Sequence, residues 1–389
     1  MVLLGREITV LGAGIGGLTA ALCFAARGAQ VRVLEQSDAI REVGAGLQIS
    51  PNGARVLAAL GLSDALISRA VRSEAVVLRD YSDGEEVLRM PLGADPGFHL
   101  IHRADLIDML AAAARTAGVA VELGRKVDQV VFSDSEAVSL RFADGTCEPV
   151  SMLVGADGLH SPVRRALDKP AQPFFTGQVA WRMVLPQTQF PEPCAQVFMG
   201  PGRHLVTYPL RGGTERNIVA VEERDRWTAE GWSHRDDPMR VARAFAGFPP
   251  RVRGWLESAR DVHVWGLFRH EVAPVWHRGA SVILGDAAHP TLPFLAQGAN
   301  LAIEDAWVLA SCMSDSADDA EAFARYQVMR QARTARAVAA ANANAKAYHL
   351  PEGPVRTMAH IALRMLNRTS PTMPLRKFDW LYNTDVTAS

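Results

Sequence analysis

The sequence lacks the features that mark a secreted, metal-binding or membrane-spanning protein. Only 4 of its 389 residues are cysteines, and none of them forms a CxxC pair or stands near histidines at metal-ligand spacing. We therefore expect no disulfide framework and no metal site, and a reducing cytoplasm fits this cysteine content. No uncharged apolar stretch reaches about 18 residues, so we expect no transmembrane helix and no membrane partner.

Neither sign of charge dominates, since 41 Lys and Arg stand against 42 Asp and Glu, for a net charge of −1. A general nucleic-acid binder carries a basic excess, so we expect no nucleic-acid partner. The apolar start of the chain carries Arg6 and Glu7 and runs directly into a glycine motif, which signal-peptide cleavage would destroy. At roughly 150 residues per domain, the length allows two or three domains, or one large α/β domain with an insert.

The apolar residues that are present indicate a nucleotide-binding βαβ unit at the start of the chain. Glu7–Leu11 and Gln30–Leu34 are short apolar runs typical of buried strands, and residues 15–27 between them have helical periodicity. Such a unit requires a parallel sheet with a right-handed crossover. A further buried strand at 281–284 and a helix at 298–313 indicate a return to this domain.

Two other patterns follow from the rest of the chain. Short alternating runs separated by Pro and Gly predict antiparallel strands within 74–99 and 174–270. An alanine- and arginine-rich stretch predicts a long helix over 320–348, and its Arg330, Arg333 and Arg336 are expected on one solvated face. The predicted fold class is α/β with an α+β insert: a Rossmann-like domain, an antiparallel-sheet domain and a C-terminal helical tail.

The motif Gly12-Ala13-Gly14-Ile15-Gly16-Gly17 stands between the first strand and the first helix. Gly12 permits a tight turn, Gly14 lets the backbone approach a pyrophosphate, and Gly17 lets the helix pack on the strand. The phosphates would sit at the helix N-terminus. Glu35 ends the next strand, where it can accept hydrogen bonds from ribose hydroxyls. This context predicts a bound dinucleotide, either NAD or FAD.

Two later motifs favour FAD. Residues 155–158 (Gly-Ala-Asp-Gly) and 285–286 (Gly-Asp) each follow an apolar strand, which places an aspartate at the crevice where open α/β sheets bind ligands. Asp286 can accept hydrogen bonds from a ribityl chain. The helix that begins at residues 298–300 can stabilise negative charge on a reduced flavin ring. An NAD dehydrogenase has no need of this third segment.

Together these ordered motifs closely resemble those of the class A flavin monooxygenases, the single-component aromatic hydroxylases, within which the sequence is most similar to the salicylate hydroxylase, 3-hydroxybenzoate 6-hydroxylase and 6-hydroxynicotinate 3-monooxygenase group. The resemblance runs from Gly12 to about Arg333. It implies bound FAD, NAD(P)H as co-substrate with NADH favoured, and O₂. The implied activity is hydroxylation of a small phenolic or N-heteroaromatic acid through a flavin C4a-hydroperoxide, by a monomer or homodimer.

The resemblance also assigns residues to the cofactor. It implies that Arg103 contacts FAD, that Asp157 serves both FAD and NAD(P)H, and that Pro293 lies against the flavin ring. The predicted cofactor-binding residues are Gly12, Gly14, Ile15, Gly16, Gly17, Glu35, Gln36, Gln48, Arg103, Val127, Asp157, Gly158, Asp286, Pro293, Gly298, Ala299 and Asn300. The implied domains are an FAD-binding domain (1–73, 100–173 and 271–318), a substrate-binding sheet domain (74–99 and 174–270) and a C-terminal helical region (319–389).

His204 and Tyr208 are the predicted catalytic residues. On one strand they point to the same face, roughly 13 Å apart. A histidine that titrates near neutral pH can take a phenolic proton, and Tyr208 can hydrogen-bond the substrate or relay that proton. The residues alone leave a core histidine and a packing tyrosine open, and the resemblance favours catalysis. The predicted substrate-binding residues are His204, Tyr208, Gln297 and Arg182.

Two alternative functions stay open at this point. One is the same chemistry on a larger secondary metabolite or quinone precursor. The other is a flavoprotein without oxygenase activity.

Overall fold

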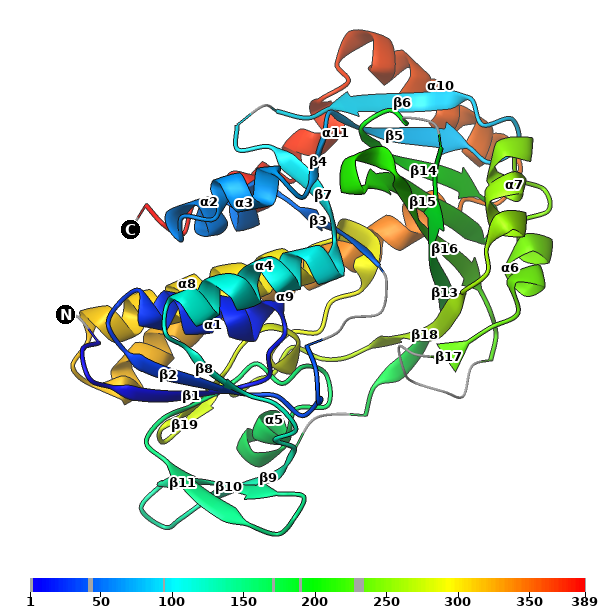
Figure 1. The fold of residues 1–389 in the computed structure, drawn as a ribbon. Coiled ribbons are helices and arrows are strands. Elements are labelled where there is room, and N and C mark those ends of the chain that lie inside the picture. Colours follow the sequence, from blue (N-terminus) through cyan, green and yellow to red (C-terminus); the bar gives the residue numbers. More distant parts are fainter. Residues whose placement is uncertain are drawn as a thin grey trace.

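The computed structural model describes residues 3–40, 45–93, 95–169, 172–188, 191–226 and 234–388, with the backbone alone at residues 345 and 346. A six-stranded sheet in the order β19-β20-β12-β1-β2-β8 forms the first half of the molecule (Figure 1). Its parallel strands are β1 (Glu7–Leu11), β2 (Gln30–Leu34), β8 (Ala120–Glu122), β12 (Leu153–Gly155) and β20 (Ser281–Ile283), and β19 (His277–Arg278) pairs antiparallel at one edge. The central strands are apolar because helices cover the sheet.

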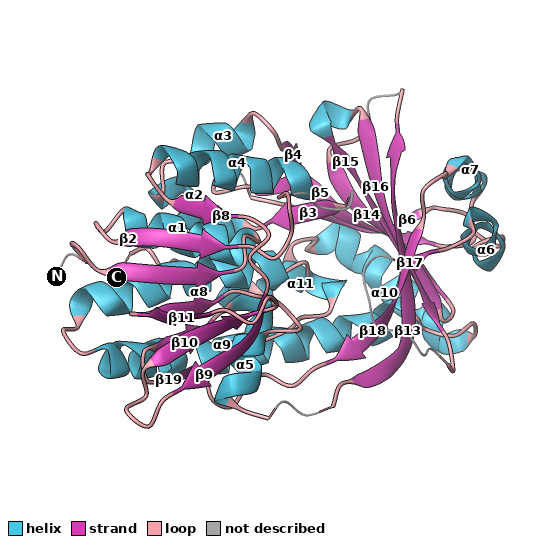
Figure 2. Cartoon of the chain, turned by 60° about the horizontal axis from the view of Figure 1, so that its bottom comes forward, coloured by secondary structure: helices cyan, strands magenta, loops and turns pink. Residues whose placement is uncertain are grey.

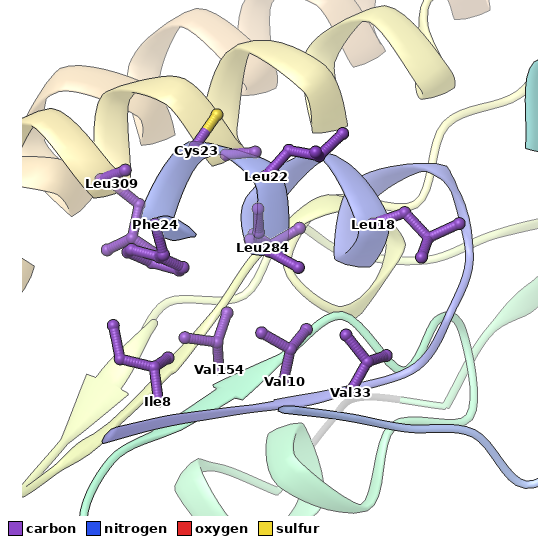
Figure 3. Packing of buried hydrophobic residues seen from close by; sticks show 14 of the residues in the cluster. Ile8, Val10, Leu18, Leu22, Cys23, Phe24, Val33, Val154, Leu284 and Leu309 are labelled. Atoms are coloured by element: carbon purple, nitrogen blue, oxygen red, sulfur yellow. The ribbon is translucent and has the colours of Figure 1, made fainter. Parts of the chain in front are cut away.

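Helix α1 (Ile15–Ala25) packs on this sheet. Figure 3 shows Phe24 of α1 facing Ile8 of β1 and Val154 of β12, whereas Leu22 points away from the strands. The helix is buried almost all round because α8 (Gly298–Asp315) and α4 (Arg103–Thr116) also pack against it. The predicted βαβ unit and the helix near residue 298 are therefore confirmed.

Two three-stranded sheets flank this core. One lies beside helices α2 (Pro51–Ala59) and α3 (Ser63–Ile67) and consists of β3 (Gly46–Ile49), β7 (Phe98–His102) and β4 (Val71–Ser73). The other lies near α5 (Pro162–Leu167) and consists of β9 (Val127–Phe132), β10 (Val138–Phe142) and β11 (Cys147–Val150).

An eight-stranded sheet forms the second half, in the order β17-β18-β13-β16-β15-β14-β5-β6. Its strands are β5 (Ala75–Asp80), β6 (Glu86–Pro91), β13 (Phe174–Pro186), β14 (Cys194–Gly200), β15 (Arg203–Leu210), β16 (Glu215–Glu223), β17 (His234–Arg235) and β18 (His263–Arg269). Helices α6 (Pro238–Ala244) and α7 (Pro250–Ser258) cover the side that faces away from the parallel sheet (Figure 2).

Both segments expected to form the insert, 74–99 and 174–270, contribute strands to this sheet. The expectation of antiparallel pairing holds for every pair in it except β14–β5, which is parallel. The β5–β6 hairpin comes from a distant part of the chain, so no short turn forces β5 to run antiparallel to β14. The domain boundaries themselves stay a prediction.

The C-terminal helices run from one half of the molecule to the other. They are α9 (Asp319–Tyr348), α10 (Pro354–Thr369), α11 (Met373–Arg376) and α12 (Asp379–Tyr382). Helix α9 begins beside the parallel sheet, and α10 packs against β6 of the large sheet (Figure 1). Arg55 of α2 holds the last segment by donating to the carbonyls of Tyr382 and Thr384 at 2.8 and 3.0 Å.

The prediction of one solvated arginine face on α9 is wrong. Arg330 is only 1% exposed and pairs with Glu304 at 2.6 Å and with Asp305 at 2.7 Å. Arg333 also pairs with Glu304, at 2.7 Å. Of the three, Arg336 alone is exposed, with its guanidinium over the Trp380 ring. The facing helix α8 carries the two acids, and buried charges require such partners.

Candidate active site

The glycine loop between β1 and α1 has two kinds of glycine. A Cβ at Gly12, where φ is +102°, would lie 2.5 Å from the carbonyl oxygen of Ala156, and a Cβ at Gly17 would lie 1.9 Å from that of Gly12. A Cβ at Gly14 would meet no heavy atom within 4 Å. Packing therefore requires glycine at positions 12 and 17. Gly14 instead faces open space at the N-terminus of α1, as a backbone position for phosphate approach must.

A cavity of about 330 Å³ opens beside this loop. Of the predicted cofactor-binding residues, it is lined by Gly12, Gly14, Glu35, Gln36, Val127 and Asp157. The Glu35 carboxylate accepts from the backbone N–H groups of Ala13 at 2.8 Å and Ser37 at 2.9 Å. These bonds fix an acceptor at the end of β2, where a ribose hydroxyl would bind. Arg125 also lines this cavity and was not expected, because no local pattern distinguishes it from a surface arginine.

Asp157 shows that this region suits a polar ligand. Burial raises the pKa of its carboxyl to about 6, against the opposing hydrogen bonds from Ser161 and from the backbone of Val163. Its Oδ1 is buried and has no hydrogen-bond partner among the residues that the structure describes. Buried acceptors are normally satisfied, so a ligand that donates a hydrogen bond would complete this site.

A larger cavity of about 510 Å³ continues from the first, since Gly14 and Ala156 line both. It lies between the parallel-sheet half and the eight-stranded sheet. Of the predicted residues, it is lined by Gly14, Ile15, Gly16, Gln48, Arg103, Arg182, His204, Tyr208, Asp286, Pro293, Gln297, Gly298 and Ala299. The three motifs, which lie far apart in the sequence, therefore converge on one continuous space. Gly17, Gly158 and Asn300 do not line either cavity.

Asp286 lies at the 3₁₀ turn Gly285–Ala287, and its side chain is accessible from the cavity. Burial by the surrounding protein raises its pKa, and the neighbouring His289 and Arg103 oppose that shift. A Cβ at Gly298 would lie 3.9 Å from Asp286 Oδ1, so the start of α8 faces this carboxyl across a short gap. Helix α8 has no side-chain N-cap, which leaves its first N–H groups for a ligand. An acceptor and a helix N-terminus thus suit a ribityl chain and an anionic ring.

Gln297 and Asn300 take part in a hydrogen-bond network within the protein. Asn300 is fully buried, and its amide accepts from Ser50 N at 3.0 Å and donates to the carbonyl of Gln48 at 2.9 Å. Gln297 donates to Ser50 Oγ at 2.9 Å and accepts from Asn52 at 3.2 Å. These amides hold the turn between β3 and α2 against α8, so they shape the cavity. A direct contact of Gln297 with substrate stays a prediction.

His204 and Tyr208 lie on β15, both are buried, and both line the larger cavity. Burial raises the pKa of Tyr208, so its hydroxyl keeps its proton at neutral pH. The His204 ring lies 5.2 Å from that of Tyr348 and 4.8 Å from that of His349, measured between centroids. Burial, and then the neighbouring His349, hold the pKa of His204 well below its usual value. The expectation that His204 titrates near neutral pH is therefore corrected, and the ring is neutral there.

The remaining expectations concern metals and membranes. Within the described ranges, no three His, Cys, Asp or Glu side chains are grouped so that they could hold a metal ion. Over those same residues, no helix combines the length and the apolar character needed to cross a bilayer.

Comparison with known proteins agrees with this geometry. The model of a family described as FAD binding domain matches residues 6–341. The chain is 39% identical to 3-amino-4-hydroxybenzoate 2-monooxygenase of Streptomyces cremeus over 90% of this chain and 89% of that protein. It is 33% identical to 3-hydroxybenzoate 6-hydroxylase of Polaromonas naphthalenivorans over 97% of this chain and 96% of that protein.

Among solved structures, Klebsiella pneumoniae HpxO complexed with FAD and uric acid matches with a TM-score of 0.81 and 26% identity, over 92% of this chain and 93% of that one. The fold, the cofactor and the enzyme class predicted from the sequence are thereby confirmed. The chain belongs to the FAD-binding domain family and, within it, to the flavin-dependent aromatic monooxygenases.

Proposed function

We propose that this enzyme uses NAD(P)H and O₂ to hydroxylate a small aromatic acid with a ring hydroxyl, and that an amino-hydroxybenzoate is its substrate. The observation that carries the proposal is the shared cavity, in which His204 and Tyr208 line the same space as the flavin motifs. The choice of substrate is supported by the relative that is 39% identical and is named for 3-amino-4-hydroxybenzoate.

Bound FAD would supply the redox chemistry, because the flavin can be reduced by NAD(P)H and can deliver one oxygen atom of O₂ to the substrate. The protein supplies binding, orientation and electrostatics. The backbone at Gly14 and the open start of α1 would hold the pyrophosphate. Asp286 and the first N–H groups of α8 would hold the ribityl chain and the ring. These are the residues that the geometry of the two cavities brings together.

The other side of the cavity prepares the substrate. Neutral His204 can accept the proton of a phenolic substrate. The resulting phenolate makes the substrate's aromatic ring more electron-rich and easier to hydroxylate. Protonated Tyr208 can donate a hydrogen bond to the substrate, and the cation of Arg182 lines the same cavity, where it can pair with a carboxylate. Apolar side chains such as Val219 and Leu292 exclude water, which protects a reactive oxygen donor from side reactions.

A second candidate, the same chemistry on a larger metabolite, is favoured by one feature of the cavity. Its wall extends to β5, β6 and α10, where it is apolar and includes Leu78, Leu88, Met90 and Leu363. This apolar extension of the cavity provides more space than a single substituted ring would need.

We further propose a cytoplasmic enzyme, monomeric or homodimeric, that favours NADH. The four free cysteines support a reducing compartment.

The test is a substrate panel with purified protein reconstituted with FAD. The panel contains 3-amino-4-hydroxybenzoate, 3-hydroxybenzoate, 6-hydroxynicotinate, salicylate and a two-ring phenolic acid. NADH and NADPH consumption are measured together with product identity, because some aromatics stimulate consumption without hydroxylation. We expect hydroxylated product from 3-amino-4-hydroxybenzoate, and FAD retention without product in His204→Ala. Product from the two-ring acid alone would support the second candidate, and no product from any acid would refute both.

A further inference from the structure

A chain of hydrogen-bonded side chains leads from the larger cavity to the surface. His204, 1% exposed, is bonded through Nδ1 to His349 Nε2 at 2.6 Å. His349 is in turn bonded through Nδ1 to Glu223 Oε1 at 2.7 Å. The Glu223 side chain is 54% exposed. A group that lines the cavity is thus connected to bulk water by two short hydrogen bonds.

The chemistry of the three groups fixes the direction of these bonds. An ionised carboxylate can only accept, so His349 Nδ1 must donate to Glu223. A neutral imidazole carries one N–H, so His349 Nε2 must accept and His204 Nδ1 must donate to it. His204 Nε2 therefore carries a lone pair, and it is the ring nitrogen left for the cavity. Glu223 thereby sets His204 in the tautomer that a proton acceptor requires.

Three separate segments hold this chain in place. His204 lies opposite Val221 in the β15–β16 pair, and Glu223 follows two residues later on β16. His349 directly follows α9, whose last residue, Tyr348, packs its ring against His204. The charged groups nearby are already engaged, since Arg203 and Arg224 both pair with Glu222, at 3.6 and 2.9 Å. Glu222 thus takes the two guanidiniums, and Glu223 faces His349.

Such a connection answers a physical difficulty at His204. Burial and the neighbouring His349 hold the pKa of His204 well below its usual value, and burial also lowers the pKa of His349. A phenol has a pKa of about 10, so a buried imidazole that only stored the proton would be a poor acceptor. Handing the proton on to an exposed carboxylate and water removes the positive charge from the cavity.

We propose that His349 and Glu223 are positioning residues that set the tautomer of His204 and carry the substrate's phenolic proton to bulk water. The substrate O–H bond breaks as an N–H bond forms at His204 Nε2. The Nδ1 proton of His204 moves to His349 Nε2, and the Nδ1 proton of His349 moves to Glu223, which releases a proton to water. The cavity gains a phenolate and the solvent gains the proton. This inference rests on the proposed function, because the proton comes from a phenolic substrate.

The first test needs no substrate. ¹⁵N-histidine NMR of the FAD-loaded enzyme near neutral pH reports which ring nitrogen carries the proton, with signals assigned from His204→Gln and His349→Gln. We expect the Nδ1–H tautomer at both histidines in the wild type and loss of that preference in Glu223→Gln. An Nε2–H tautomer at His204 in the wild type would overturn the proposal.

The second test follows the proton. FAD-loaded enzyme is mixed with 3-amino-4-hydroxybenzoate in weakly buffered phenol red, and proton release is timed by stopped flow. We expect release to slow at least about tenfold in His349→Gln and Glu223→Gln, with probe affinity within about threefold of the wild type. The matched control is Glu222→Gln, the adjacent acid on β16 that lies outside the chain, which should release protons at the wild-type rate.

The outcomes separate the two proposals. Wild-type release rates in both variants, or equal slowing in Glu222→Gln, would overturn the relay. If the wild type neither binds the probe nor releases a proton, the proposed substrate is wrong, and the tautomer spectra decide the relay by themselves.

Discussion

Replacement of Gly14 by alanine should separate cofactor binding from folding. Gly14 has φ −74° and ψ −176°, which any residue adopts, and its Cβ would meet no heavy atom within 4 Å. The gain from a less flexible unfolded chain is about 0.4–1 kcal/mol. The loss from alanine as an N-cap is about 0.5–1 kcal/mol. The two nearly cancel, so the stability of the FAD-free protein should change by less than about 1 kcal/mol.

FAD affinity should respond quite differently. The new methyl group points into the space where the pyrophosphate would meet the start of α1, so at least one hydrogen bond from the backbone to a phosphate is lost. A hydrogen bond to a charged group contributes about 1.5–3 kcal/mol. The Kd for FAD should therefore rise about ten- to a hundredfold.

The assay is a titration of FAD-free protein followed by quenching of flavin fluorescence, beside a thermal melt of the same sample. Gly17→Ala is the contrasting variant, because its Cβ would lie 1.9 Å from the carbonyl oxygen of Gly12 and should prevent correct folding. Gly254→Ala on α7 is the matched control, since its Cβ also meets nothing within 4 Å but lies far from the cavities in sequence and fold. Wild-type FAD affinity in Gly14→Ala would refute the assignment of the glycine loop.

Three further predictions concern the buried charges between α8 and α9 and Tyr208 of β15. Arg330→Met removes the cation that two buried carboxylates share, although Glu304 keeps Arg333 and Asp305 keeps His289. It should lower the free energy of unfolding by about 3 kcal/mol in urea titrations, whereas exposed Arg336→Met should change it by less than about 0.5 kcal/mol. Burial raises the pKa of Asp305, but His289 and Arg330 outweigh this effect and hold the pKa at about 2, below the ordinary value of an aspartate. Its contribution to stability should be complete above pH 4 and lost as the pH falls towards 2, so stability that stays flat across that window would contradict the pairing. Tyr208→Phe should lower kcat at least about tenfold without loss of FAD, measured by product formation; unchanged kcat would exclude the hydroxyl from the reaction.

The parts of the fold that the sequence predicts are those with local causes. The β1–α1–β2 unit follows from apolar periodicity and from glycines that only a tight turn explains, and both strands have the predicted bounds. The placement of His204 and Tyr208 on one buried strand follows equally from spacing along that strand. In each case the residues that determine the structure are neighbours in the sequence.

What the sequence did not predict depends on contacts between distant segments. The parallel β14–β5 pair joins residues more than a hundred positions apart, and no local signal specifies its direction. Arg330 resembles a surface residue until Glu304 and Asp305 of α8 are placed against it. His349 is a single histidine after a helix, without a motif, and its importance follows only from its bond to His204. For this reason the roles of side chains at the site are harder to predict from the sequence than the secondary structure.

The wall of the larger cavity has one consequence for how enzymes of this architecture diverge. The C-terminal helices contribute Tyr348, Leu363 and Tyr382 to this wall, and the turn between α11 and α12 contributes Phe378. The segments that grip the nucleotide and those that bound the far wall are thus separate stretches of one gene. Mutation or recombination confined to the second can retune which aromatic compounds are accepted while inheritance of the first preserves the redox chemistry.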